Sequence, residues 1–224
     1  MAVLSSIVNI VKRIKSYFNK SNTVKTYRLP NLIVAGTQKS GSSWTHFYLS
    51  NLKEVFGSEV KELTYFNKIN PSQDELENYK SNFIAGDERY YLESTPHYFM
   101  LPSAKLDIAQ NIFDALSAQQ DMKIIIILRN PVERALSAIV HHMMRNRLEY
   151  VKLITEVDNR FKIKELGLYY STLIHWKTIF GDRLGVFFYD DLESQPEKYV
   201  RQLHAFLDIK FNLSLSKQFF KKES

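Results

Sequence analysis

Cysteine is absent from this chain of 224 residues. A chain without cysteine cannot form a disulfide, a zinc–cysteine site or a thiol nucleophile, so these three kinds of site are excluded. A reducing cytoplasm is the simplest compartment for such a chain. Apolar runs of about 20 residues, the length that crosses a bilayer as a helix, are also missing. We therefore expect a cytoplasmic protein.

The first 29 residues differ in character from the rest. Within residues 7–15, isoleucine and valine recur at helical spacing among lysine and arginine side chains. The pattern predicts a short basic amphipathic helix, which can contact a membrane surface peripherally or pack on the domain that follows. Residues 30–224 show no internal repeat and no low-complexity linker, and their length fits a single α/β domain.

The charge of the chain favours anionic ligands. Lysine and arginine number 30 against 24 aspartate and glutamate residues, which gives a formal net charge of +6. Such an excess suits a polyanionic partner. Nucleic acid is disfavoured, because the charge is dispersed along the chain and no DNA- or RNA-binding pattern is present.

Residues 32–43 form an apolar stretch that runs into a glycine-containing loop. Gly36 and Gly41 have the spacing of a Walker loop, in which lysine follows the second glycine. Here that position is Ser42, and the lysine of the loop is Lys39. Backbone N–H groups of the loop, and of a helix starting near Ser42, still suit an anion. The loop therefore predicts an anionic nucleotide but not an ordinary kinase reaction.

A second strand supports the same site. Lys123–Leu128 contains four consecutive isoleucines and is typical of a parallel strand buried on both faces. It ends at Arg129, where a triphosphatase would usually place an aspartate that helps to hold magnesium. A guanidinium binds phosphate directly, so no metal is implied. Asn130, Pro131 and Glu133 then form a good helix start, which places Arg129 where open parallel sheets bind ligands.

The coarse layout alternates strands and helices, which predicts a three-layer α/β sandwich around a central parallel sheet. Residues 67–88 are expected to be a polar excursion. The predicted strands are the apolar start of 32–43, and 90–93, 123–128 and 184–189. The predicted helices after the loop helix are 131–147, 164–180 and 196–207.

Five blocks of the chain resemble the sulfotransferases that use 3′-phosphoadenosine 5′-phosphosulfate (PAPS), particularly the branch acting on carbohydrates and heparan-type glycans. The blocks occur in the family's order and together extend over most of the chain. They are GTQKSGSSW at 36–44, KELTYF at 61–66, ESTPHYF at 93–99, RNPVERALSAIVHH at 129–142 and LGLYYSTLIHWKTIFGDRLGVFFYDDLESQPEKYVRQLHAFL at 166–207.

This resemblance implies a P-loop NTPase-like sulfotransferase fold, PAPS as co-substrate and no metal. Lys39 would stabilise the charge that develops on the oxygen between sulfur and the leaving phosphate. The implied donor-binding residues are Lys39, Ser40, Gly41, Ser42 and Ser43 for the 5′ end, and Arg129 and Ser137 for the 3′-phosphate.

The helix predicted for 131–147, which carries Ser137, raises two further expectations. Arg134, on the same helix, is interpreted as a structural residue that forms an ion pair. His141 and His142 point about 100 degrees apart, so at most one of them can face a cleft.

The resemblance also suggests the base that removes the acceptor proton. In the glycan branch this is a glutamate in a Lys-Glu-x-x-x-Phe block, here Glu62. In the branch that sulfates phenols and steroids it is a histidine, which makes His97 the rival candidate. With Glu62 as base, the expected acceptor is a hydroxyl or amine of a saccharide or other small molecule.

Two departures from the family pattern leave alternatives open. Ser94 stands where glycan sulfotransferases commonly have a lysine, and Lys39 or Lys61 would have to compensate for it. No basic glycine-containing loop occurs near the C-terminus, so the terminal lysines substitute for it or the donor binds weakly. The alternatives are therefore a degenerate nucleotide-binding module without turnover and, less favoured, a P-loop small-molecule kinase.

Overall fold

The computed structural model describes residues 25–157 and 160–220. Five parallel strands form one sheet in the order β2-β3-β1-β4-β5. Because β1 lies between β3 and β4, the chain leaves it toward one side first and crosses to the other side later. The strands are β1 (Leu32–Gly36), β2 (Val55–Gly57), β3 (Tyr90–Ser94), β4 (Lys123–Leu128) and β5 (Leu184–Phe188).

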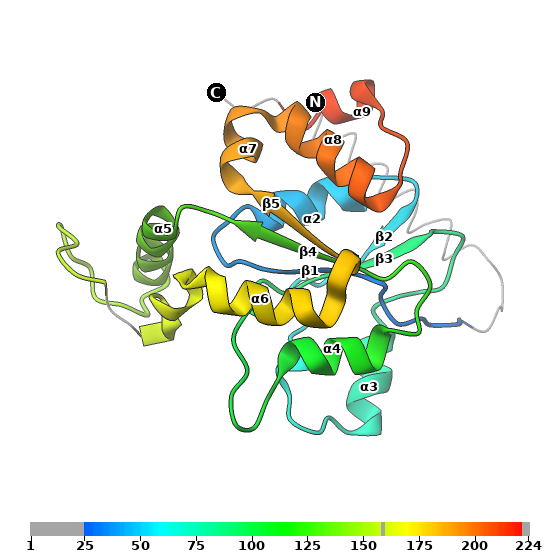
Figure 1. The fold of residues 1–224 in the computed structure, drawn as a ribbon, viewed down its shortest axis with the longest axis horizontal. Helices are drawn as coiled ribbons and strands as arrows, with labels where there is room; N and C mark the ends of the chain where they lie inside the picture. The colour runs from blue at the N-terminus through cyan, green and yellow to red at the C-terminus, as the bar shows by residue number, and fades with distance from the viewer. Residues whose placement is uncertain (1–24, 158–159, 221–224) are drawn as a thin grey trace.

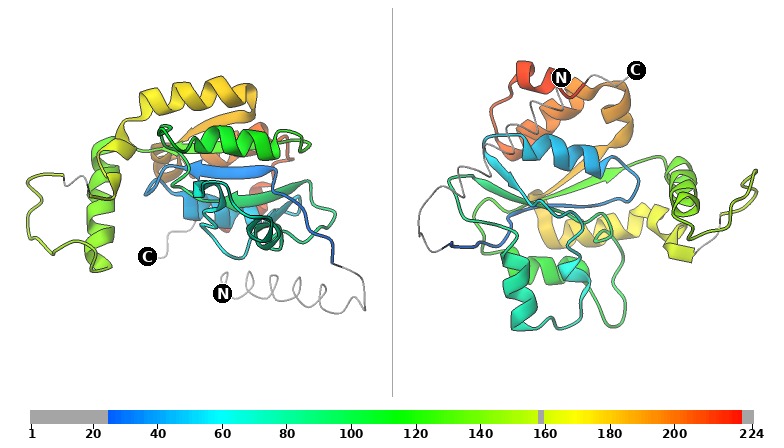
Figure 2. Two further views of the ribbon diagram at one scale, coloured as in Figure 1. Left: turned by 90° about the horizontal axis from the view of Figure 1, so that it is seen from below. Right: turned by 180° about the vertical axis from the view of Figure 1, so that it is seen from behind.

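Helices cover both faces of the sheet, as Figure 1 shows. One layer consists of α2 (Ser42–Ser50), α7 (Tyr189–Ser194), α8 (Pro196–Leu207) and α9 (Leu213–Lys217). The other consists of α3 (Gln73–Lys80), α4 (Ile108–Leu116) and α6 (Tyr169–Phe180). Helix α5 (Pro131–Met144) stands beyond the end of β4, apart from both layers (Figure 2). Short 3-10 turns occupy Tyr65–Asn67, Arg160–Lys162, Glu165–Gly167 and Gly181–Arg183.

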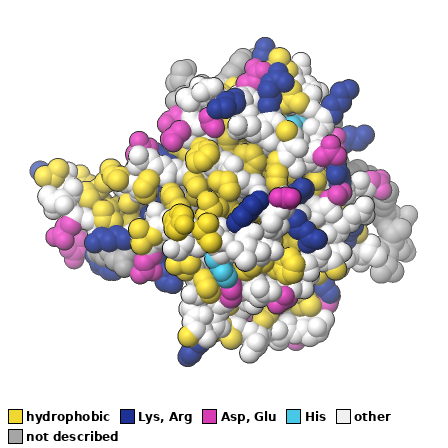
Figure 3. Space-filling view, in the orientation of Figure 1, with side chains coloured by type: hydrophobic (Ala, Val, Ile, Leu, Met, Phe, Trp, Pro, Cys, Tyr) yellow, Lys and Arg dark blue, Asp and Glu magenta, His cyan; other side chains and the backbone are white. Residues whose placement is uncertain are grey.

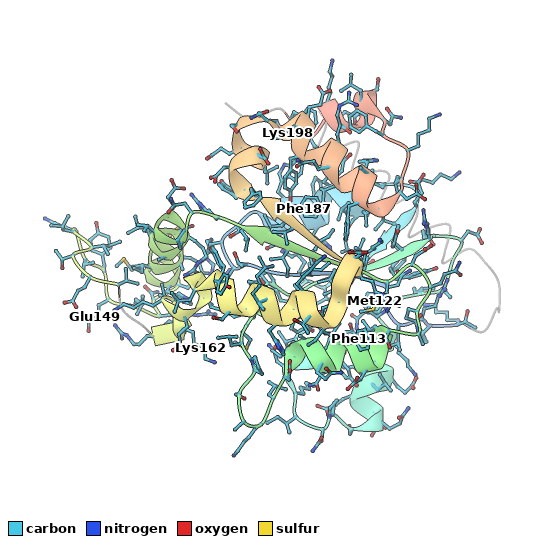
Figure 4. All side chains as sticks on the ribbon, in the orientation of Figure 1. Phe113, Met122, Glu149, Lys162, Phe187 and Lys198 are labelled. Atoms are coloured by element: carbon cyan, nitrogen blue, oxygen red, sulfur yellow. The ribbon has the colours of Figure 1, made fainter. Side chains whose placement is uncertain are left out.

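The isoleucine run of β4 supplies both halves of the core. Successive side chains of a strand point to opposite faces. Ile124 and Ile126 accordingly pack in the cluster that contains Trp176 of α6, and Ile125 and Ile127 pack in the cluster that contains α8. In Figure 4, Phe187 lies on the α8 side of the sheet, whereas Phe113 and Met122 lie on the α4 and α6 side. The predicted three-layer sandwich with a parallel central sheet is confirmed.

The boundaries of several predicted elements need correction. The helix predicted for 131–147 ends at Met144, and the one predicted for 164–180 begins at Tyr169. Residues 67–88, expected to be a polar excursion, contain α3, because Ser72 and Glu75 form a capping box at its start. Strand β2 and helix α4 were not predicted. The basic helix expected around residues 7–15 lies outside the described residues.

Helix α5 has two chemically different faces. Val132, Leu136, Val140 and Met144 recur every four residues and are all exposed, up to 81% for Met144. Figure 3 shows hydrophobic side chains gathered over α5 and α6 on this side of the molecule. An adjacent face of α5, which carries Ser137 and His141, lines a cavity at the carboxyl edge of the sheet. The helix therefore forms one wall of that cavity.

We predict that Gly36→Ala destabilises the protein by about 1–3 kcal/mol, because an added β-carbon would overlap Cβ of Phe99. Urea-induced unfolding measures the change. Gly167→Ala is the matched control, since its new methyl group would meet its nearest neighbour, Pro131, at an ordinary 3.4 Å. Equal midpoints for the two variants would show that β1 can move away from Phe99.

Candidate active site

The loop after β1 is held by hydrogen bonds to β4. Thr37 donates its N–H to the Ile127 carbonyl at 2.8 Å, and its hydroxyl donates to the same oxygen at 3.1 Å. Because that proton is used, the Thr37 Oγ1 accepts from Ser40 Oγ at 2.6 Å. Ser40 is fully buried. A donor-binding role for Ser40 would therefore fall to its backbone N–H.

The loop turns through two left-handed residues. Lys39 has φ 67° and Gly41, the N-cap of α2, has φ 84°. A β-carbon at Gly41 would lie 2.8 Å from Leu192 of α7, so glycine is required there for space as well as for backbone conformation. The turn places the N-terminus of α2 at the carboxyl edge of the sheet, with its first N–H groups unpaired by the helix.

A cavity of about 760 Å³ opens at this edge, within the size range of small-molecule sites. The structure brings together residues from all five sequence blocks there. The sequence-predicted residues that line it are Lys39, Gly41, Ser42, Ser43, Glu62, His97, Arg129 and Ser137. The predicted site residues thus share one cavity, with Ser40 buried just behind its wall.

Arg129 is oriented from several sides. Its Nη1 donates to the Lys39 carbonyl at 3.3 Å, and its guanidinium carbon lies 4.4 Å from the centre of the Tyr189 ring. Glu133, one turn along α5, pairs with Nη2 at 3.3 Å. The Tyr169 hydroxyl donates to the Arg129 carbonyl at 2.9 Å. These contacts fix the end of β4 relative to the loop after β1.

Further cations line the cavity that sequence reasoning missed. Arg145 and Arg147 lie just beyond α5 and face the same space as Lys39. Burial lowers the pKa of Lys39 most, and the charges of Arg145 and Arg129 lower the pKa further. Bringing like charges together costs free energy, which a bound anion would relieve. The spacing of Ser137, His141 and Arg145, four residues apart, is the signal that could have identified this wall.

Two predictions about α5 have different outcomes. His141 lines the cavity, whereas His142 is buried and stacks on Phe161 at 4.0 Å between ring centroids, so one histidine of the pair faces the cleft as predicted. The prediction that Arg134 forms an ion pair is wrong: among the described residues, no carboxylate pairs with it. Its guanidinium is fully buried and donates to the Ile163 carbonyl, a neutral acceptor that spares the burial of a carboxylate.

Both candidate bases enter the same cavity. Glu62 is exposed, has φ 59°, and its backbone N–H donates to the Ser94 carbonyl at 2.9 Å. His97 is half-buried, and burial is the main cause that lowers its pKa. The charge of Glu62 opposes this effect and that of Arg147 adds to it. The geometry is therefore compatible with either residue acting as base.

A buried carboxylate organises the segments that carry these bases. Glu93, fully buried at the end of β3, accepts hydrogen bonds from Tyr79 Oη and Thr95 Oγ1 at 2.7 Å and from Tyr98 Oη at 2.8 Å. Burial raises the pKa of Glu93, and these three donors oppose the rise. The Tyr98 hydroxyl in turn accepts from the Phe66 N–H at 3.3 Å. The network joins the segment of Glu62 to that of His97.

Ser94 and Lys61 occupy neighbouring positions near the start of α2. Ser94 is buried and its Oγ lies 2.8 Å from His46 Nδ1. Burial and the charge of Lys61 lower the pKa of His46 to about 4. Lys61 Nζ donates to Ser43 Oγ at 2.7 Å. A cation therefore lies beside the first turn of α2, although Ser94 itself is neutral.

The C-terminal end of the described chain closes one side of the cavity with aromatic rings. Phe219 and Phe220 line it, and Phe219 packs edge-on against Tyr48 at 5.2 Å between centroids. Lys217 is exposed on α9. Lys221 and Lys222, which were expected to substitute for a basic loop, lie outside the described residues.

Within residues 25–157 and 160–220, no cluster of three or more potential metal-ligating side chains occurs. None of the helices described there has the length and apolar character needed to cross a bilayer.

We predict that Glu93→Ala lowers the free energy of unfolding by at least about 3 kcal/mol, because three buried hydroxyls lose their acceptor and each costs roughly 1–3 kcal/mol. Glu77→Ala is the control, since its exposed side chain makes surface contacts, with Lys80 and Gln73. Chemical denaturation compares the two. A Glu93→Ala protein as stable as the control would mean that the network contributes nothing.

Comparisons with known proteins agree with this architecture. Among solved structures, a sulfotransferase from Alicyclobacillus acidocaldarius aligns with a TM-score of 0.67 at 22% identity, over 84% of this chain and 88% of the other. Mouse sulfotransferase SULT7A1, solved in complex with PAP, aligns with a TM-score of 0.58 at 18% identity, over 87% and 63% of the two chains. At these identities the likeness establishes the fold, which is the predicted P-loop-like sulfotransferase fold.

Curated relatives are similar in sequence. The membrane-associated sulfotransferase kil1 of Dictyostelium discoideum is 31% identical over 139 residues, which are 58% of this chain and 28% of that protein. The bifunctional heparan sulfate N-deacetylase/N-sulfotransferase 1 of Caenorhabditis briggsae is 27% identical over 205 residues, 81% of this chain and 23% of that protein. The chain thus spans about a quarter of the length of these relatives.

The family model of the sulfotransferase domain matches residues 29–223, which contain every strand of the sheet and the whole described lining of the cavity. The fold, the order of the motifs and this match lead to one conclusion: the chain belongs to the sulfotransferase domain family.

Proposed function

We propose that the protein transfers the sulfuryl group of PAPS to a hydroxyl or amine of an acceptor, and that the acceptor is a saccharide. The observation that carries this proposal is the convergence of Lys39, the α2 N-terminus, Arg129 and Ser137 on one cavity. Cations and unpaired N–H groups at the carboxyl edge of a parallel sheet suit a ligand with phosphate groups at both ends.

The two ends of the donor fit two different parts of the wall. The phosphosulfate would bind at the start of α2, where Gly41, Ser42 and Ser43 offer N–H and hydroxyl donors. The 3′-phosphate would bind Arg129 together with Ser137 of α5, which lines the same cavity. Arg129 suits this role because Tyr189 and Glu133 already orient its guanidinium, so little conformational entropy is lost on binding.

Lys39 is the proposed catalytic cation. During transfer, negative charge accumulates on the oxygen that leaves with the nucleotide, and a cation beside that oxygen lowers the barrier. Burial lowers the pKa of Lys39 most, and the charges of Arg145 and Arg129, which line the same cavity, lower it further. A site with this excess of cations stabilises a leaving group whose charge grows in the transition state.

Glu62 is the proposed base, and its chemistry bears on the acceptor class. An aliphatic hydroxyl holds its proton tightly, so its attack needs a base more than that of a phenol does. The C. briggsae relative, named for a heparan sulfate N-deacetylase/N-sulfotransferase activity, supports a saccharide acceptor. His97 remains the rival base, and a module without turnover remains the alternative function.

We predict that the protein binds 3′-phosphoadenosine 5′-phosphate (PAP) more tightly than ATP with magnesium, and that Arg129→Ala weakens PAP binding by roughly 10- to 100-fold. A charge-assisted hydrogen bond to a phosphate contributes about 1.5–3 kcal/mol. Isothermal titration calorimetry measures both affinities. Adenosine 5′-phosphate, which lacks the 3′-phosphate, should bind wild type and variant alike.

Arg201→Ala is the matched control, because Arg201 pairs with Glu197 on the outer side of α8. An unchanged PAP affinity of Arg129→Ala would contradict the assignment of the 3′-phosphate. Tighter binding of magnesium ATP than of PAP would instead support the kinase hypothesis.

We predict that Glu62→Gln retains PAP affinity and loses transfer activity by roughly 100- to 10 000-fold, because the amide keeps the shape of the side chain but cannot accept the proton. Sulfate transfer from PAPS to heparan-type saccharides, at saturating donor, measures the rate. Glu59→Gln, an exposed glutamate three residues earlier, is the control. If His97→Ala abolished transfer while Glu62→Gln kept it, the base and the saccharide assignment would both be wrong.

A further inference from the structure

Lys61 reaches the donor end of the cavity without lining it. Its ammonium nitrogen lies 2.7 Å from Ser43 Oγ, across from the first turn of α2. Ser43 is exposed and lines the cavity, as does Glu62, the residue that follows Lys61. Lys61 itself is half-buried. The lysine therefore stands directly behind a hydroxyl that faces the ligand space.

The direction of this hydrogen bond is fixed by chemistry. An ammonium group has three donors and no acceptor, so the Ser43 oxygen must accept. The hydroxyl proton of Ser43 is then free to be donated to a group in the cavity. A hydroxyl that accepts from a cation also becomes a stronger donor, because each hydrogen bond in a chain polarises the next.

We propose that Lys61 is a positioning residue that orients and polarises the Ser43 hydroxyl toward the sulfuryl group of the donor. The proposal rests on the proposed sulfotransferase function, which supplies the sulfuryl group. It assigns to a Lys61–Ser43 pair the positive charge that the neutral Ser94 cannot provide.

The groups around Lys61 support this assignment. Burial lowers the pKa of Lys61, and the adjacent Glu62 opposes that shift and favours the charged form. On the other side, His46 hydrogen-bonds Ser94 and has its pKa lowered to about 4, so it is neutral at pH 7. Lys61 is therefore the group that donates to the Ser43 hydroxyl.

A double-mutant cycle over Lys61 and Ser43 tests the proposal. The variants are Lys61→Met, which keeps the length of the side chain without its charge, Ser43→Ala, and the double variant. Two readouts are needed: the rate of PAPS hydrolysis to PAP and sulfate at saturating PAPS, which requires no acceptor, and the affinity for PAP by calorimetry. Lys53→Met is the control, because Lys53 is exposed and does not line the cavity.

We expect Lys61→Met to slow hydrolysis roughly tenfold or more, as removal of a donor to developing charge does, while PAP affinity changes less than about twofold because PAP lacks the sulfuryl group. The double variant should be no slower than the slower single variant, because each substitution interrupts the same Lys61–Ser43 pair. Lys61→Arg should recover part of the rate.

Additive losses in the double variant, or a fall in PAP affinity that matches the fall in rate, would overturn the proposal in favour of a purely structural lysine. So would Lys61→Met with wild-type hydrolysis. If the wild-type protein bound PAP but neither hydrolysed PAPS nor transferred its sulfuryl group to a saccharide, the proposed function would fail. Failure confined to the variants would overturn the role of Lys61 alone.

Discussion

The burial of Glu93 is the constraint on which the base side of the site depends. A carboxylate out of contact with water is costly unless hydrogen bonds replace its hydration. Tyr79, Thr95 and Tyr98 supply three donors, and they come from α3 and from the turn after β3. Satisfying the carboxylate therefore requires α3, β3 and that turn to meet in one arrangement. Glu62 and His97 lie on the segments that this arrangement fixes.

The loop after β1 and the end of β4 are held together by a cation instead. Arg129 links the loop after β1 to the end of β4 through the Lys39 carbonyl, and the face of Tyr189 lies against it. Arg145 adds a further positive charge close enough to lower the pKa of Lys39. This wall is under electrostatic repulsion that an anion would relieve. The site thus combines a buried carboxylate whose hydrogen bonds are satisfied with a group of cations that repel one another.

Sequence reasoning predicted the parts of the fold that follow from local patterns. The isoleucines of β4 and the Asn130–Pro131 helix start are such patterns, and the glycines of the loop after β1 are a third. The Ser72–Glu75 capping box was an available signal that was overlooked, so α3 was missed. The full set of hydrogen-bond donors to Glu93 could not be predicted, because Tyr79 comes from α3, whereas Thr95 and Tyr98 come from the turn after β3. The ion pair predicted for Arg134 was wrong because the acceptor of its guanidinium is the backbone carbonyl of Ile163, which no sequence pattern identifies.

The placement of charge around the cavity also gives the proposed reaction a direction. Lys39, Arg129 and Arg145 attract the phosphate and sulfuryl oxygens of a donor, whereas Glu62 repels them. The charged part of the donor is therefore driven toward the loop after β1 and the start of α5. An acceptor hydroxyl, which carries no charge before attack, is free to approach Glu62 and His97. Donor and acceptor would thus be sorted by charge within one cavity, which brings the two reacting groups together for transfer of the sulfuryl group.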